Sequence, residues 1–143
     1  MGTSSATRKV SDSDYRRLLH FRTGLRRFLR WSEDQAGQVG LTGTQHQLLL
    51  AIKGHPDRRG PTIGEVAHYL VLKPHSAVGL VDRAEEAGLV TRVHDGADRR
   101  VSRLALTDGG EDLLARLSAL HLEELARLAP QIQSIWADLD RSS

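Results

Sequence analysis

The chain has 143 residues, of which 39% are hydrophobic and 27% are charged, a composition typical of one globular domain with its own core. No apolar run approaches the ~18 residues that a membrane-spanning helix needs, and the first ten residues do not resemble a secretory signal. The chain has no cysteine, which excludes disulfides, thiolate zinc sites and cysteine-based redox switches. Together these features predict a cytoplasmic protein.

The net charge of +2 is distributed unevenly along the chain. Residues 1–30 carry eight basic and two acidic groups, residues 31–106 carry nine of each, and residues 107–143 carry three basic and seven acidic groups. A surface that binds nucleic acid usually has a basic excess, because phosphates attract Lys and Arg. In this chain the basic excess lies at the N-terminal end.

A long amphipathic helix is predicted near the N-terminus, capped by Asp12 or Ser13 and ended by Gly37 and Gly40. Its apolar residues recur at steps of three and four: Tyr15, Leu18, Leu19, Phe21, Leu25, Phe28 and Leu29. Arginines fill much of the remaining surface. They indicate chiefly a solvated basic face, with contacts to phosphates or to an anionic ligand as the alternative.

A second, largely apolar helix is predicted to begin at Thr42, where Gln45 completes a capping box. Gly54 and Pro56 are expected to end it. After a loop, residues 61–63 can add a short strand beside a later hairpin.

Two short helices and a hairpin are predicted next. Thr62 and Glu65 have the spacing of another capping box. Pro74 suits the first turn of the following helix, and Gly88 suits its end. Two alternating stretches, VTRVH and VSRLAL, flank the charged turn DGADRR. Such an order predicts a winged helix-turn-helix, and we expect residues 62–107 to bind DNA.

The helix that begins at Pro74 is the expected reader of the major groove. Its core-facing positions are predicted to be Ala77, Leu80, Val81 and Ala84. The predicted DNA contacts on and before it are Lys73, Pro74, His75, Ser76, Val78, Gly79 and Arg83. His75 and Ser76 can bond to base edges or phosphates, and Val78 can contact a thymine methyl. Lys73 suits a phosphate, while Arg83 can reach a phosphate or pair with an acid.

A final helix is predicted from Thr107, and it carries more leucines than one face of a small domain needs. Pro130 is expected to interrupt it, with a short amphipathic helix resuming afterwards. Because the apolar stripes at both chain ends lack an obvious partner, we expect them to intertwine with a second copy in a two-fold dimer. The alternative is that they pack only on their own chain.

The ordered combination of LVDRAEEAGLVTR, DGADRR and LALTDGGEDLL resembles the MarR-type winged-helix transcription regulators of bacteria, over nearly the whole chain. The resemblance implies one domain over residues 1–143 that is mainly α with a small β wing. Residues 11–40 and 108–141 would form dimerisation helices, and residues 42–107 would form the DNA-binding lobe.

The resemblance also implies roles at the wing tip. In the family the tip typically carries an aspartate-x-arginine pair, whose arginine enters the minor groove and whose aspartate orients it. Here these are Asp98 and Arg100, with Arg99 as a neighbouring phosphate or groove contact. A guanidinium is drawn to the narrow minor groove of A·T-rich DNA, and a neighbouring carboxylate preorganises it.

Family resemblance further implies a regulator, most often a repressor, that binds a pseudo-palindromic operator as a homodimer. A small aromatic or anionic effector is expected between the dimerisation helices and the winged domain, with Tyr15, His20 and Arg26 as candidates by position. The chain departs from the family pattern at Gly79, where many relatives have a long polar residue, and at Ala84, where leucine is usual. Readout is therefore expected to depend more on the wing and on DNA shape, unless Gly79 permits a closer approach to DNA.

Other functions find less support. The chain has no nucleophile elbow, P-loop or glycine-rich turn after a strand, so we expect neither an enzyme nor a cofactor. Its seven histidines lack metal-ligand spacing, which predicts no metal site. Two alternatives stay open: a non-specific or architectural DNA-binding protein, and a winged-helix module for protein interaction without DNA binding.

Overall fold

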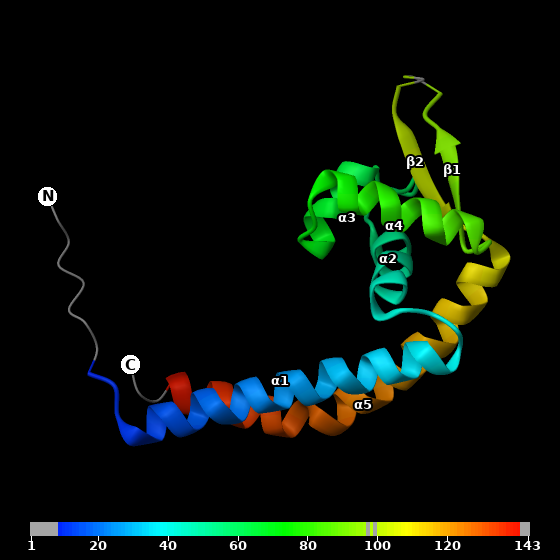
Figure 1. Ribbon diagram of the computed structural model, residues 1–143. Helices are drawn as coiled ribbons and strands as arrows, with labels where there is room; N and C mark the ends of the chain where they lie inside the picture. Colours follow the sequence, from blue (N-terminus) through cyan, green and yellow to red (C-terminus); the bar gives the residue numbers. More distant parts are fainter. Residues whose placement is uncertain (1–8, 97, 99, 141–143) are drawn as a thin grey trace, which may run out of the picture. The chain divides into compact units, whose positions relative to one another are not determined.

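The computed structural model describes residues 9–96, 98 and 100–140, and within them the chain forms five helices and a two-stranded sheet (Figure 1). In chain order the elements are α1 (Asp12–Gln38), α2 (Gly43–Gly54), α3 (Ile63–Leu70), α4 (Pro74–Glu86), β1 (Val90–His94), β2 (Ser102–Leu106) and α5 (Asp108–Asp140). The predicted fold class, mainly α with a small β wing, is confirmed.

The chain divides into two compact units, and α1 and α5 contribute to both. We call residues 32–123 the winged lobe, and the residues up to 31 and from 124 onward the terminal unit. Helices α2, α3 and α4 and the hairpin belong entirely to the winged lobe, which therefore contains the predicted DNA-binding elements.

Two predicted capping boxes fix the starts of α2 and α3. The hydroxyl oxygens of Thr42 and Thr62 each accept a hydrogen bond from the backbone N–H three residues on. The side chains of Gln45 and Glu65 accept bonds from the two threonine N–H groups in return. Both predicted capping boxes are therefore confirmed. Each such cap stabilises its helix by about 1 kcal/mol.

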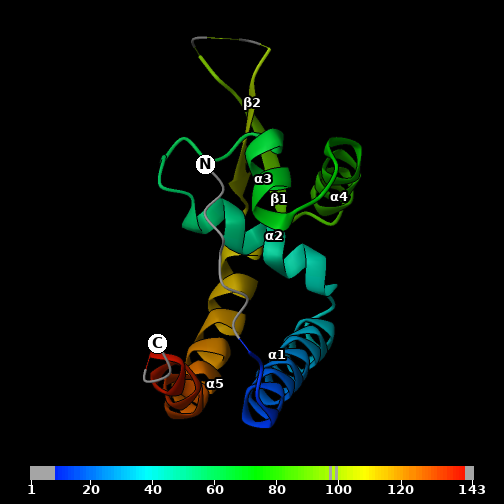
Figure 2. The same ribbon diagram turned by 90° about the vertical axis from the view of Figure 1, so that its left-hand side faces the viewer.

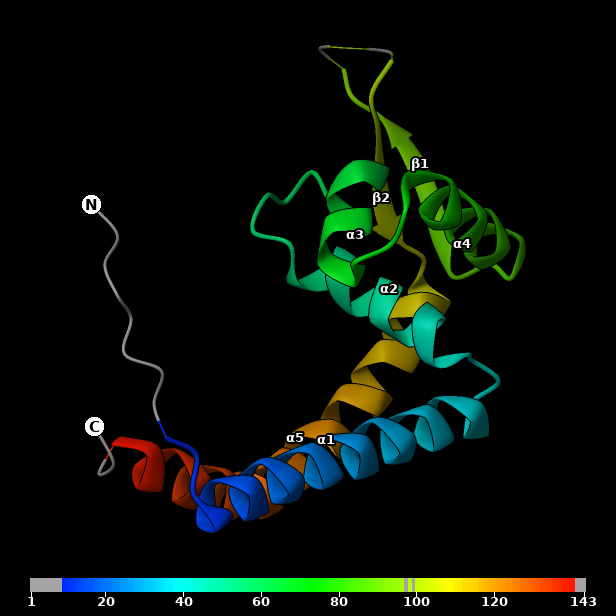
Figure 3. The same cartoon turned by 60° about the vertical axis from the view of Figure 1, so that its left-hand side comes forward.

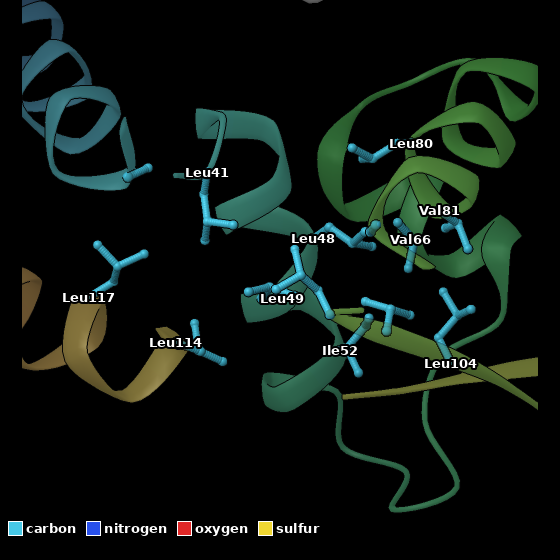
Figure 4. Close-up of a cluster of buried hydrophobic side chains, with 14 residues drawn as sticks. Leu41, Leu48, Leu49, Ile52, Val66, Leu80, Val81, Leu104, Leu114 and Leu117 are labelled. Atoms are coloured by element: carbon cyan, nitrogen blue, oxygen red, sulfur yellow. The ribbon is translucent and has the colours of Figure 1, made fainter. Parts of the chain in front are cut away.

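An apolar core fills the winged lobe (Figure 4). Leu48 and Leu49 of α2 and Leu104 of β2 are fully buried in it, and Leu114 and Leu117 of α5 face α2. The inward positions predicted for α4 are all buried: Ala77, Leu80, Val81 and Ala84. Because burying one large aliphatic side chain stabilises a fold by roughly 1.5–3 kcal/mol, this core fixes which face of α4 meets solvent.

The strands β1 and β2 form an antiparallel hairpin, the wing, which projects from the winged lobe (Figures 2 and 3). His94 pairs with Ser102 next to the turn. The strand expected over residues 61–63 is reduced to a single bridge between Thr62 and Arg103. This bridge joins the loop before α3 to β2, on the side of β2 opposite β1.

In the terminal unit, the first part of α1 runs beside the last part of α5 (Figures 1 and 3). The N-terminal cap of α1 is Ser11, whose hydroxyl accepts the N–H of Asp14 at 3.2 Å. The carboxylate of Asp14 accepts the N–H of Ser11 at 3.0 Å in return. The expected cap at Asp12 or Ser13 is therefore wrong, because the helix begins immediately after Ser11 and needs an acceptor one residue earlier.

Helix α5 continues through Pro130, so the expected interruption there is wrong as well. A proline inside a helix removes one backbone hydrogen bond and crowds the preceding turn. Alanines and leucines, which are strong helix formers, precede it in the sequence ELARLAP. We attribute the unbroken helix in part to their propensity.

Candidate nucleic-acid interface

The second helix of the helix-turn-helix, α4, begins at a site suited to an anion. Lys73 is its N-cap and makes no side-chain capping bond. Pro74 takes the first helical position, where its missing N–H is harmless. The positive end of the helix dipole and the ammonium group of Lys73 therefore both favour a phosphate here.

The residues predicted to contact DNA from this region lie on the surface opposite the core. The exposed members of the set are Lys73, Pro74, His75, Ser76, Val78 and Arg83. Gly79 is half-buried. Val78 is 41% exposed, and a valine so placed suits a thymine methyl better than water. The structure brings these residues together on one helix face, and their contact with DNA stays a prediction.

Arg83 lies over the position where Gly79 lacks a side chain. A Cβ atom added at Gly79 would come within 3.3 Å of the Nη1 of Arg83, the far end of a flexible side chain. Gly79 therefore meets no steric demand from the rest of the lobe. Because the guanidinium of Arg83 occupies this space, we expect it to supply part of the readout that Gly79 cannot.

At the wing tip, Asp98 and Arg100 are described and exposed, while the predicted contact Arg99 lies outside the described residues. The Oδ1 of Asp98 accepts a hydrogen bond from the backbone N–H of Arg100 at 3.0 Å. The backbone N–H of Val101 donates to the carbonyl of Asp98 at 3.1 Å. Asp98 thus orders the turn through the backbone, and the guanidinium of Arg100 has no carboxylate partner among the described residues.

Arg92 of β1 pairs with two of the three acidic groups of α4. Arg92 of β1 donates to Asp82 at 2.5 Å and to Glu85 at 2.7 Å. The hydrogen bond to Asp82 raises the pKa of Arg92, so this guanidinium stays charged. Asp82 and Glu85 are therefore held against the wing, and the charge of Arg92 offsets part of their repulsion of phosphates.

The remaining cations of the lobe fall into paired and unpaired groups. Lys53, Arg59 and Arg103 form ion pairs with acidic residues. Within the described part of residues 32–106, the cations without a carboxylate partner are Arg58, Lys73, Arg83 and Arg100. All but Arg58 lie on or beside α4 or on the wing. The balanced charge of this segment therefore conceals unpaired cations on the elements predicted to bind DNA.

A second candidate site is a hollow of about 600 Å³ in the terminal unit. Its lining residues are Arg16, Arg17 and His20 of α1 and Pro130, Gln131, Ser134 and Ile135 of α5. The guanidinium of Arg17 is paired with Asp14 at 3.1 Å. Of the three ligand candidates, His20 lines the hollow, whereas Tyr15 and Arg26 do not.

Two further observations concern other classes of site. In the part of the chain that the structure describes, no group of three or more His, Asp or Glu side chains is arranged to hold a metal ion. No described helix is both long enough and apolar enough to cross a membrane.

Comparison with known proteins identifies relatives of the helix-turn-helix and wing. Residues 39–101 match the family model described as MarR family. The chain is 32% identical over 96 residues to the transcriptional repressor MdtR of Bacillus subtilis, a match covering 64% of this chain and 60% of MdtR. It is 34% identical over 71 residues to the transcriptional activatory protein BadR of Rhodopseudomonas palustris, covering 50% of this chain and 41% of BadR. The chain thus spans less than two thirds of the length of either relative.

Solved structures share the fold over most of the chain. CouR from Rhodococcus jostii RHA1, bound to p-coumaroyl-CoA, is 28% identical with a TM-score of 0.73, covering 94% of this chain and 92% of CouR. A MepR–DNA complex from Staphylococcus aureus is 20% identical with a TM-score of 0.70, covering 94% of this chain and 97% of that one. At that identity the likeness to MepR shows the fold alone. That the relatives are transcription regulators agrees with the expectation of a protein that is not an enzyme.

Proposed function

We propose that this chain is a MarR-type winged helix-turn-helix regulator that controls transcription by binding double-stranded DNA, because residues 39–101 match the MarR family model and the chain is similar to MdtR and CouR. The observation that carries the proposal is the distribution of cations that have no carboxylate partner among the described residues: Lys73, Arg83 and Arg100 lie beside α4, on α4 and on the wing. Phosphates supply the opposite charge, and each neutralised phosphate strengthens binding by releasing counterions.

In this proposal the two elements read DNA differently. Helix α4 occupies the major groove, where His75 and Ser76 bond to base edges and Val78 meets a thymine methyl. The wing tip enters the neighbouring minor groove, where Arg100 responds to groove width. Since His75, Ser76 and Arg83 are the polar groups of α4 suited to base edges or phosphates, we expect much of the sequence preference to come from DNA shape at the wing.

We further propose that the protein acts as a homodimer. Large apolar side chains are exposed on both helices of the terminal unit: Tyr15, Leu18, Leu19, Leu25, Leu29, Leu125 and Ile132. Apolar surface of this kind is typical of a face that another chain covers. Residues 11–40 and 108–141 would then join two copies, each with a DNA-binding lobe over residues 42–107. Two α4 helices about 34 Å apart would require a pseudo-palindromic operator.

We propose a small anionic or aromatic effector for this regulator, bound in the hollow of the terminal unit. Arg16 and His20 can bind a carboxylate or phosphate there, while Pro130 and Ile135 can contact an apolar ring. The structure of CouR with p-coumaroyl-CoA offers a relative bound to a molecule of both kinds. Tyr15 and Arg26 stay candidates by position alone. An effector acts only by differential affinity for two arrangements of the dimer.

Repression is the proposed direction of control, because MdtR is a repressor. Repression of a neighbouring promoter requires only that the bound dimer blocks polymerase. A promoter–reporter assay with and without the protein tests this direction. Lower reporter output on expression supports it, whereas higher output would place the protein with activators such as BadR.

Titration of the full chain against the DNA upstream of its own gene tests the proposed function. We expect tighter binding to this DNA than to a scrambled duplex, and an affinity that falls steeply with salt. Equal affinity for both duplexes would identify a non-specific or architectural DNA-binding protein. Absence of binding at low salt would instead favour a protein-interaction module.

A further inference from the structure

The root of the wing is held by Arg103, a residue outside the set of proposed DNA contacts. Its Nε donates a hydrogen bond to the Oδ2 of Asp95 at 3.1 Å. Its Nη1 donates to the backbone carbonyl of Gly60 at 2.9 Å. The side chains of Arg103 and Asp95 are only 15% and 12% exposed, so solvent screens their ion pair weakly.

Arg103 therefore joins three elements. Asp95 follows β1 directly, Gly60 belongs to the loop between α2 and α3, and Arg103 itself is on β2. The carboxylates of Asp57 in the loop and Glu65 in α3 lie 3.9 and 4.0 Å from its Nη1. We call Arg103, Asp95, Asp57 and Gly60 the wing-root clamp.

The loop side of the clamp has contacts of its own. Arg59 donates through Nε and Nη2 to the carboxylate of Asp57, which lowers the pKa of Asp57 well below its usual range. Gly60 has a φ of +89°, and a Cβ atom there would come within 2.0 Å of the carbonyl oxygen of Leu104. The loop thus lies directly against β2 and offers Arg103 a fixed acceptor.

The other side of the clamp controls the turn of the wing. The backbone N–H of Asp95 donates to the carbonyl of Val101 at 3.0 Å, which closes the hairpin just before the tip. Arg100, the proposed minor-groove contact, precedes Val101 directly. A two-stranded hairpin is at best marginally stable alone, so its direction depends on contacts at its root.

We propose that Arg103 is a positioning residue that sets the direction of the wing and thereby delivers Arg100 to the minor groove. This inference rests on the proposed DNA binding. In the proposed complex Arg103 itself does not contact DNA. Its guanidinium joins an acid after β1 to the loop carbonyl with two N–H groups, which the single ammonium of a lysine reproduces poorly.

The first test measures wing motion without DNA. Since the chain has no cysteine, Gly96→Cys introduces a unique thiol at the tip, where a Cβ atom meets nothing within 4 Å. A fluorophore on this thiol should show a larger amplitude of nanosecond anisotropy decay in Arg103→Met than in the parent. Arg116→Met, an exposed arginine on α5, is the control and should change nothing. Unchanged anisotropy in Arg103→Met would overturn the proposal.

The second test measures coupling between Arg103 and Arg100 in DNA binding. Arg103→Met should weaken operator binding about ten-fold when Arg100 is present, and less than about two-fold in an Arg100→Ala background. Equal losses in both backgrounds would show a general structural role and refute positioning. Arg103→Lys should retain part of the affinity.

A second variant covers the case in which Arg103→Met does not fold. If Arg103→Met fails to fold, Asp95→Asn breaks the same ion pair from the other strand with little change of volume, and the same results are expected from it. If the parent chain binds no DNA, the proposed function fails. The anisotropy experiment then still decides whether Arg103 holds the wing.

Discussion

The imidazole rings of His46 and His121 lie 4.7 Å apart inside the winged lobe, between α2 and α5. The Nδ1 of His121 is 2.6 Å from the carbonyl oxygen of Leu117, and its Nε2 is 2.7 Å from the hydroxyl of Ser32. Because a carbonyl oxygen can only accept, the Nδ1 of His121 donates the hydrogen bond to Leu117. His46 is 5% exposed, and its Nδ1 has no hydrogen-bond partner within the described structure.

This arrangement predicts that the fold weakens in mild acid. Burial, and secondarily the neighbouring His121, lowers the pKa of His46. Its contribution to stability is therefore complete above the ordinary histidine pKa of about 6.5 and is lost as the pH falls below that value. We expect the melting temperature to drop between pH 7 and pH 5, and His46→Phe to flatten this dependence. His20→Gln, at an exposed position, is the control and should keep the pH dependence of the melting temperature. If His20→Gln flattened that dependence as much as His46→Phe, His46 would not be its source.

The turn between α3 and α4 is strained at Val71. This residue has φ 54° and ψ 48°, and its side chain is 90% exposed. A left-handed conformation costs a non-glycine residue roughly 1–2 kcal/mol, and the exposed valine gains little from burial. Val71→Gly should therefore raise the free energy of unfolding by about 1 kcal/mol, measured by urea denaturation. Val78→Gly, inside α4, should lower the free energy of unfolding by a similar amount. If Val71→Gly also lowered it, Val71 would not be strained.

Local signals in the sequence predicted much of the winged lobe. The Thr62 capping box depends on four consecutive residues, and the buried face of α4 follows from helical spacing alone. The predicted cap of α1 was wrong because each of the three neighbouring residues Ser11 to Ser13 has a side-chain oxygen that can cap a helix starting directly after it. The interruption at Pro130 was also wrong, because a proline weakens a long helix without necessarily ending it.

Contacts between distant parts of the chain could not be predicted in the same way. Arg103 and Gly60 are 43 positions apart, and only the packing of the loop against β2 brings them together. Residues 31–106 carry equal numbers of basic and acidic groups, so the charge count showed no basic excess there. A count also cannot distinguish Arg92, which is paired, from Arg58, which has no carboxylate partner among the described residues. The wing-root clamp and the unpaired cations were therefore visible only in three dimensions.

Gly60 is predicted to tolerate no side chain. An alanine there would need a disfavoured positive φ and would bring its Cβ within 2.0 Å of the Leu104 carbonyl oxygen. We expect Gly60→Ala to lower the free energy of unfolding by more than about 1 kcal/mol. Gly24→Ala, in an open position inside α1, should raise it by roughly 0.5–1 kcal/mol. Denaturant titrations measure the free energy of unfolding of both variants. An unchanged value for Gly60→Ala would contradict the close contact between Gly60 and the carbonyl of Leu104.

The wing arginine is the most direct test of the DNA contacts. Arg100→Ala should weaken operator binding by about 1–3 kcal/mol, because the guanidinium would no longer enter the minor groove. Its melting temperature should stay unchanged, since the side chain is exposed and lacks a carboxylate partner in the described structure. Fluorescence anisotropy of a labelled operator measures the affinity. Arg116→Ala removes the same charge from α5, and a loss as large in that variant would point to general electrostatics.

Leu125 tests whether the terminal unit joins two copies. Its side chain is 41% exposed on α5, within the apolar set that the proposed dimer would cover. Leu125→Asp would place a charge in that interface, and desolvating an unpaired carboxylate is costly, so we expect dissociation into monomers. Val93→Asp provides the control, because Val93 is 49% exposed on β1 of the wing and should leave the assembly intact. Sedimentation velocity distinguishes the two species, and a Leu125→Asp chain that remains fully dimeric would show that this part of α5 lies outside the interface.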